Sequence, residues 1–274
     1  GDARAQPFAT LAGEAALARY ANAEAVMYFT LALEWAQHSP DAAPLAALYA
    51  ARGRALELSG QFTEAVQNYQ ALGAVAEARN DQRLKLKALV QEGILRSNVN
   101  PMFDPPEGHR LAAEALELAA ALNDQDAEAK VYWNRMNLHR FEGDNTAARA
   151  NGEQSLALAR AAGAAEQEAA TLNDLIHVYG TLAAWPEHLA VAAEAAQRWR
   201  TLGNLPMLAD SLATVSLWAA LRGDYDLALT ASAEAGQIAR SINNLWGQSY
   251  SLSGTGMALW HRGDYAQAMQ LTRE

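Results

Sequence analysis

Amide, carboxylate and indole side chains gather in the middle of this chain of 274 residues. Trp133, Asn134 and Asn137 stand close together, and Asn173 and Asp174 follow about one repeat length later. Amide and acid groups can hydrogen-bond a polar ligand or a peptide backbone, and an indole ring supplies a flat apolar surface. These residue types therefore predict ligand binding.

The sequence does not favour catalysis. It lacks the phosphate-binding loop Gly-x-x-x-x-Gly-Lys-Ser/Thr, the nucleophile motif Gly-x-Ser-x-Gly and the dinucleotide motif Gly-x-Gly-x-x-Gly. There is no cysteine, and the 6 histidines show no metal-ligand spacing such as His-Glu-x-x-His. We therefore expect no enzyme activity, no cofactor and no metal.

A repeated turn signal organises the whole chain. Gly143, Gly223 and Gly263 are spaced by multiples of 40 residues, Gly60 is an earlier copy, and Ala183 fills the missing place. Turns are expected near residues 20, 60, 103, 143, 183, 223 and 263, the first of them at Tyr20. A second series of turns, which includes Asn80, Asn123 and Asn243, lies between these. Two turns in each period leave room for two helices.

Each repeat is expected to contain a first helix (A), a tight turn and a second helix (B). The turn glycine suits the left-handed end of helix A, and Asp144, Asp224 and Asp264 are placed to cap helix B. Five residues after the turn stands a small residue that permits close helix packing, with Gly108 and His188 as exceptions. These small residues are Ala25, Ala65, Ala148, Ala228 and Ala268.

The predicted fold is all-α, a right-handed superhelical solenoid of about seven antiparallel helix pairs. Residues 1–274 are expected to form a single repeat domain, because no linker or shift in composition interrupts them. The last repeat is expected to be truncated, as in a fragment of a longer chain. The irregular segment 98–106 predicts an ordered, protruding loop, and Ser253–Gly256 predicts close packing inside a helix.

The pattern resembles the tetratricopeptide repeat (TPR). The second repeat has Gly60, Phe62, Ala65 and Tyr69 at the matching positions. Because the usual TPR is about 34 residues long, the longer period is similar to the repeat regions of bacterial STAND signalling ATPases and MalT-like transcription activators. The opening segment 11–25 and the segments 203–211 and 245–252 carry this second resemblance. It implies a cytoplasmic array attached to an ATPase or regulator.

The resemblance also implies which residues bind. In TPR proteins the A helices line a concave groove, at fixed positions counted back from the turn. Counted in this way, the groove residues of this chain are Lys130, Trp133, Asn134, Asn137, Arg140, Asn173, Asp174, His177, Asp210 and Tyr250. The alternative interpretation is that these polar residues only bridge neighbouring repeats. Trp218 is expected to contribute to packing.

Two functions remain open. The first is a non-catalytic scaffold or sensor that holds a protein or peptide segment in its groove. The second is a receptor for a small molecule such as a metabolite or sugar, which a compact cluster around Trp133 would suit. A net charge of −10 argues against nucleic-acid contact, and no apolar run is long enough to cross a membrane. Nothing in the sequence indicates the oligomeric state.

Overall fold

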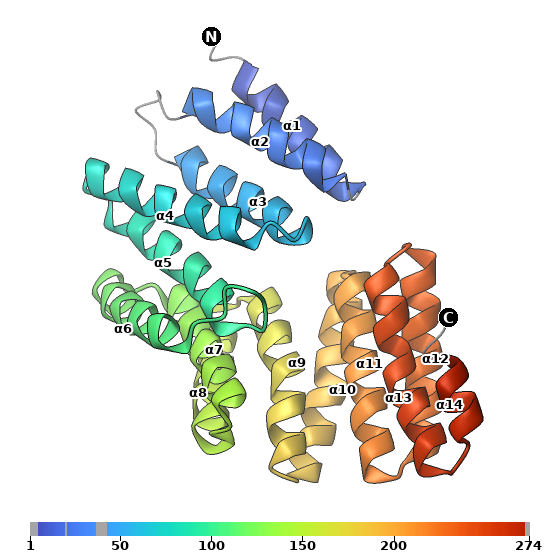
Figure 1. Ribbon diagram of the computed structural model, residues 1–274. Coiled ribbons are helices and arrows are strands. Elements are labelled where there is room, and N and C mark those ends of the chain that lie inside the picture. The colour runs from blue at the N-terminus through green and yellow to red at the C-terminus, as the bar shows by residue number, and fades with distance from the viewer. Residues whose placement is uncertain (1–4, 20, 37–42, 272–274) are drawn as a thin grey trace. The chain divides into compact units, whose positions relative to one another are not determined.

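The computed structural model describes residues 5–19, 21–36 and 43–271, which fold almost entirely into α-helices joined by short turns (Figure 1). Two compact units are present, Gly1–Gly143 and Asp144–Glu274. Whether the whole chain also behaves as one repeat domain stays a prediction. The turn expected at Tyr20 lies outside the described residues.

The first unit contains α1 to α7. Consecutive helices pack against one another as antiparallel pairs, which gives the helix–turn–helix repeat expected from the sequence. Phe29, Tyr49 and Leu72 are fully buried in the largest core of this unit. The helices are α1 (Ala5–Ala18), α2 (Asn22–Ala36), α3 (Ala43–Leu58), α4 (Phe62–Arg79), α5 (Gln82–Ser97), α6 (Pro105–Leu122) and α7 (Gln125–Glu142).

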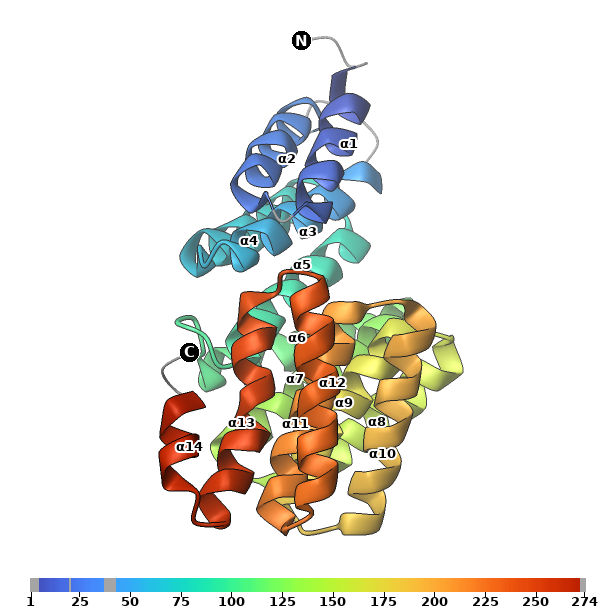
Figure 2. The ribbon, with the colours of Figure 1, turned by 90° about the vertical axis from the view of Figure 1, so that its right-hand side faces the viewer.

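The second unit contains α8 to α14. Helix α11 packs against both α12 and α13, and α9 packs against α10, so that A and B helices form two layers (Figure 2). Its main core gathers around Trp199, Leu208 and Leu212. The helices are α8 (Asn145–Ala162), α9 (Ala165–Thr181), α10 (Trp185–Leu202), α11 (Leu205–Arg222), α12 (Tyr225–Ser241), α13 (Leu245–His261) and α14 (Tyr265–Leu271). The predicted all-α solenoid fold is confirmed.

The turns after the A helices have the backbone expected for the repeated glycine. Gly143, Gly223 and Gly263 have φ values of 89°, 86° and 86°, in the left-handed region that favours glycine. Ala183 adopts the same conformation with φ at 52°, although its Cβ is disfavoured there. The 40-residue period thus marks the ends of helices, as predicted.

Close packing and capping also follow the predicted pattern. All five alanines that stand five residues after a turn are buried: Ala25, Ala65, Ala148, Ala228 and Ala268. Oδ1 of Asp144 accepts a hydrogen bond from the backbone N of Ala147 at 2.9 Å, and Oδ1 of Asp224 accepts one from Leu227 at 3.3 Å. Each of these carboxylates satisfies an N–H that the first turn of its helix leaves without a partner.

Residues 98–104 form the connection that replaces a tight turn between α5 and α6. The side-chain amide of Asn100 donates to the backbone oxygens of Leu95 and Asn98, both at 2.8 Å, and Oδ1 of Asn100 accepts from the backbone N of Met102. Phe103 packs edge-on against Phe141 of α7. These bonds give the connection a defined conformation, as expected for an ordered loop. None of the described helices is long and apolar enough to cross a membrane.

Candidate functional site

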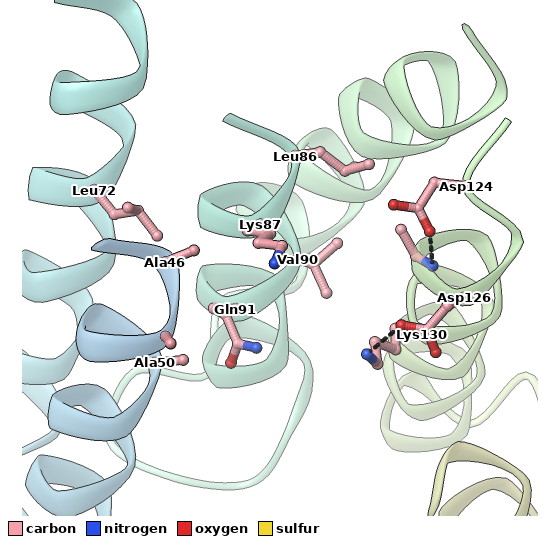
Figure 3. A pocket seen from close by; sticks show the side chains of 12 residues that line it. Ala46, Ala50, Leu72, Leu86, Lys87, Val90, Gln91, Asp124, Asp126 and Lys130 are labelled. Carbon is pink, nitrogen blue, oxygen red and sulfur yellow. Dashed lines mark hydrogen bonds and ion pairs between the residues drawn. The ribbon is translucent and has the colours of Figure 1, made fainter. Parts of the chain in front are cut away.

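A cavity of about 250 Å³ lies against the A helices of the first unit (Figure 3). Its apolar wall comes from small and aliphatic side chains on α3, α4 and α5. Polar side chains of α5 and α7 face the same space. The lining residues are Ala46, Ala47, Ala50, Leu72, Leu86, Lys87, Val90, Gln91, Asp124, Asp126, Ala127 and Lys130.

Charged groups of both signs meet in this cavity. Lys130 Nζ pairs with Asp126 Oδ2 at 2.6 Å along α7. Asp124 caps the same helix through the backbone N of Ala127 at 3.0 Å. Lys87 is exposed on α5, across from them (Figure 3). The cavity therefore offers the Lys87 ammonium group as a hydrogen-bond donor, the Asp126–Lys130 ion pair and a narrow apolar floor.

The other predicted residues of the first unit lie deeper than a groove position requires. Asn134 and Asn137 are buried, with relative exposures of 2% and 0%, and Trp133 is half-buried. Nδ2 of Asn134 donates to the backbone oxygen of Val90 at 3.3 Å, so this amide bridges α7 to α5. Its Oδ1 has no hydrogen-bond partner among the described residues.

Asn137 and Arg140 lie one helical turn apart on α7. The Arg140 guanidinium donates to Oδ1 of Asn137 at 3.3 and 3.4 Å, and it also stands over the Phe141 ring, 4.1 Å from the centroid. Asn137 therefore pairs with Arg140, and its side-chain amide is not exposed on the surface. The depth of Asn134 and Asn137 differs from what the sequence predicts.

Polar side chains on neighbouring A helices of the second unit pair with one another. We call this set the polar row; it comprises Asn173, Asp174 and His177 of α9, Asp210, Thr214 and Trp218 of α11, and Tyr250 of α13. Nδ2 of Asn173 donates to Oδ2 of Asp210 at 3.0 Å. Trp218 Nε1 donates to Nδ1 of His177 at 3.2 Å, and the hydroxyls of Thr214 and Tyr250 lie 3.1 Å apart.

The Asn173–Asp210 pair has unusual electrostatics. Burial raises the pKa of Asp210 to about 6, the charge of Asp174 acts in the same direction, and the Asn173 hydrogen bond opposes them. Asn173 is 3% exposed, and its Oδ1 has no hydrogen-bond partner among the described residues. A buried amide oxygen without a partner costs roughly 1–3 kcal/mol. At 3% exposure Asn173 lies about as deep as Asn134, so its role is to join α9 to α11 through Asp210.

An aromatic surface adjoins the polar row on α13. The rings of Trp246 and Tyr250 stack with their centroids 4.9 Å apart, and Trp246 is 62% exposed. Large apolar rings on a surface are typical of binding sites for peptides and small ligands. The stacked rings of Trp246 and Tyr250 lie on α13, the A helix that contributes Tyr250 to the polar row.

The structure joins predicted residues of neighbouring repeats. It pairs Asn173 with Asp210 and His177 with Trp218, which agrees with the bridging alternative and with the packing role expected of Trp218. Packing against Gly180 is also present, because a Cβ there would lie 2.7 Å from the Trp218 ring. Sequence analysis missed Lys87, Gln91 and Trp246. The signal for Lys87 was its place on the A helix of the third repeat.

No protein-family model matches the chain, and no curated protein matches it significantly. Among solved structures, the chain is similar to a Rap protein complexed with Competence and Sporulation Factor. The TM-score is 0.75 at 14% identity, and the match covers 98% of this chain and 73% of that one. It is also similar to BtubC from P. vanneervenii, with a TM-score of 0.56 at 16% identity, over 77% of this chain and 88% of that one. At these identities the likeness shows the fold: this chain has a TPR-like helical repeat fold.

Proposed function

We propose that this chain is a repeat scaffold that binds a peptide or protein segment on the A-helix faces of its repeats. The observation that carries the proposal is the polar row. Asn173 and Asp210 stand paired on adjacent A helices, and the half-buried side chains of Asp174, His177 and Tyr250 continue the row toward the surface. A peptide backbone offers N–H donors and C=O acceptors in alternation, which suits an amide and a carboxyl group placed together.

The cavity of the first unit supports the same proposal. Its apolar floor on α3 and α5 accommodates a side chain, while Lys87 and the Asp126–Lys130 pair provide charges for polar groups at its rim. At about 250 Å³ it is smaller than most drug-sized ligand pockets, which start near 300 Å³. This size favours one side chain of a peptide over a whole metabolite.

One structural neighbour supports a binding role. The Rap protein in the similar structure is complexed with Competence and Sporulation Factor, and its fold resembles that of this chain along most of both lengths. We further propose that the array is the cytoplasmic repeat region of a larger bacterial signalling ATPase or transcription regulator. That context rests on the sequence resemblance of segments 11–25, 203–211 and 245–252.

A small-molecule receptor is the second candidate. The stacked Trp246 and Tyr250 rings favour it, because an exposed aromatic platform also suits a sugar or another flat metabolite. The two candidate functions differ in the number of helices that would contact the ligand. A metabolite would depend on one unit alone, and a peptide would depend on several A helices.

The test is a selection of random peptides displayed against the full chain, followed by calorimetric titration of the enriched sequences. Lys87→Ala and Trp246→Ala remove exposed side chains from the A-helix faces of the first and second units. Glu117→Ala on α6 and Gln197→Ala on α10 are matched controls, because both side chains are exposed on B helices. The proposal expects weaker binding for at least one of the first pair and none of the second. Failure to enrich any peptide, or equal binding by all four variants, contradicts it.

A further inference from the structure

Three side chains from two helices of the first unit bring metal-ligand atoms together. His109 comes from α6, and His139 and Glu142 come from α7. Their ligand atoms all lie within 4.8 Å of one another. Nε2 of His109 is 2.9 Å from Oε2 of Glu142, and Nδ1 of His139 is 3.7 Å from the same oxygen. The sequence predicted no metal site, because His109 stands on a different helix from the other two.

These separations fit a tetrahedral cation. With metal–ligand bonds of about 2.0–2.1 Å, the ligand atoms of a tetrahedral zinc ion lie about 3.3 Å apart. The distances of 2.9 and 3.7 Å fall on either side of this value, and all three ligand atoms lie within 4.8 Å of one another. Two imidazole nitrogens and a carboxylate oxygen are a common zinc ligand set, in which the fourth position stays open.

The helices hold the ligands close by a specific contact. Gly108 precedes His109, and a Cβ at this glycine would lie 2.8 Å from Cδ2 of Leu138, which precedes His139. The absence of a Cβ at Gly108 leaves room for the Leu138 side chain where α6 and α7 pack closely at this level. The same close approach puts the two imidazole rings 5.1 Å apart between centroids. The ligand positions are therefore set by the backbone.

The position of Glu142 also favours a cation. It is the last residue of α7, where the negative end of the helix dipole disfavours a carboxylate. A divalent ion beside Glu142 removes this repulsion. The side chains are partly exposed, at 35%, 21% and 37% for His109, His139 and Glu142, so an ion can enter from solvent.

We propose that His109, His139 and Glu142 form a zinc-binding site that joins α6 to α7, with water as the fourth ligand. The site belongs to the first unit, whereas the polar row belongs to the second, and the site does not depend on the proposed peptide binding. Bound zinc ties the ends of two helices together. It is expected to raise the thermal unfolding midpoint of the chain.

The test uses the full chain without a histidine tag. Zn²⁺ is titrated by calorimetry, and Co²⁺ is added as a spectroscopic probe whose visible absorption is intense only in tetrahedral sites. Wild type is expected to bind one equivalent of either ion. His109→Ala, His139→Ala and Glu142→Gln are each expected to weaken binding by about tenfold or more. His261→Ala is the matched control, since this histidine lies on α13 in the other unit.

The outcomes separate cleanly. Tetrahedral Co²⁺ absorption that is lost in the three variants and kept in the control supports the site. Absence of Zn²⁺ binding, octahedral Co²⁺ absorption, or affinity that the three substitutions leave unchanged overturns it. Circular dichroism shows whether each variant is folded. If one fails to fold, the remaining two decide, and the rise of the wild-type melting midpoint with Zn²⁺ provides an independent readout.

Discussion

Asn173 on α9 donates a side-chain N–H to Oδ2 of Asp210 on α11, over 3.0 Å. The bond joins consecutive A helices of the second unit. It agrees with the alternative interpretation of the sequence, in which polar residues bridge neighbouring repeats, and it does not exclude binding. The amide oxygen of Asn173 is buried and has no partner among the described residues, whereas the Asp210 carboxyl group is half-buried and faces the same row.

The raised pKa of Asp210 predicts a pH dependence of stability. Its pKa is about 6 in the folded chain, against an ordinary value of 3.8, so the folded state holds more protons between these limits. Its contribution to stability is therefore fully present below about pH 4 and is lost as the pH rises through about 6. The amide of Asp210→Asn does not ionise, so this variant lacks the loss of stability at higher pH. Its side-chain oxygen still accepts the hydrogen bond from Asn173.

The free energy of unfolding of Asp210→Asn, relative to wild type, is expected to increase by on the order of 2 kcal/mol between pH 4 and pH 7. Urea unfolding at the two pH values measures this change. Asp226→Asn on α12 is the control, because its carboxyl group is exposed. An equal difference between Asp210→Asn and wild type at both pH values contradicts the assignment.

Two glycines of α13 are expected to respond in opposite ways to alanine. A Cβ on Gly254 would lie 2.6 Å from the backbone carbonyl carbon of Ser216 on α11, so Gly254→Ala should destabilise the chain by about 1–3 kcal/mol. A Cβ on Gly256 meets nothing within 4 Å. Gly256→Ala should therefore stabilise the helix by up to about 1 kcal/mol. Urea midpoints of the two variants test the pair, and a similar loss in both would show that the close approach of α11 and α13 is misassigned.

These glycines refine the prediction for Ser253–Gly256. The sequence predicts close packing for the whole segment. The structure shows it at Gly254 and at Thr255, whose Oγ1 donates to Oγ of Ser232 at 2.7 Å, whereas Gly256 has open space beside it. A glycine can stand where two helices approach closely or where no atom is near. The residue type alone does not say which. The neighbouring helix decides, and the neighbouring helix is not visible in a local pattern.

Ala183 occupies the turn position that is glycine in other repeats. Its φ of 52° is unfavourable for a residue with a Cβ, by roughly 1–2 kcal/mol. Ala183→Gly is therefore expected to raise the free energy of unfolding by about 1 kcal/mol. Ala184→Gly is the adjacent control, since Ala184 has a negative φ of −80° and gains nothing from glycine. Thermal unfolding of both variants provides the comparison; no gain for Ala183→Gly would contradict the turn assignment.

The sequence predicted the repeat better than the site. Turn residues such as Gly143 and small residues such as Ala148 follow local rules of backbone and packing, so their spacing is sufficient to locate the helices. The depth of a polar side chain depends on the helix opposite it. Asn134 is buried because Gly93 on α5 leaves room for its amide, where a Cβ would lie 2.9 Å from Nδ2. Counting residues back from the turn does not reveal which residue of the neighbouring helix faces Asn134.

The cluster of His109, His139 and Glu142 was missed for a related reason. His139 and Glu142 have the i, i+3 spacing that puts two ligands on one helix face, and this was a usable signal. The third ligand comes from another helix, and the close approach at Gly108 that brings it near is a property of the folded pair. Spacing alone therefore gave no metal site.

The most direct test of the central claim is the affinity of a selected peptide for wild type, Asn173→Ala and Gln197→Ala, measured by isothermal titration calorimetry. If the A-helix face of the second unit binds the peptide backbone, Asn173→Ala loses hydrogen bonds worth about 1–3 kcal/mol, a weakening of roughly fivefold to a hundredfold. Gln197→Ala, on the opposite layer, should bind like wild type. Circular dichroism confirms that each variant is folded. Equal affinity of all three proteins would contradict the account.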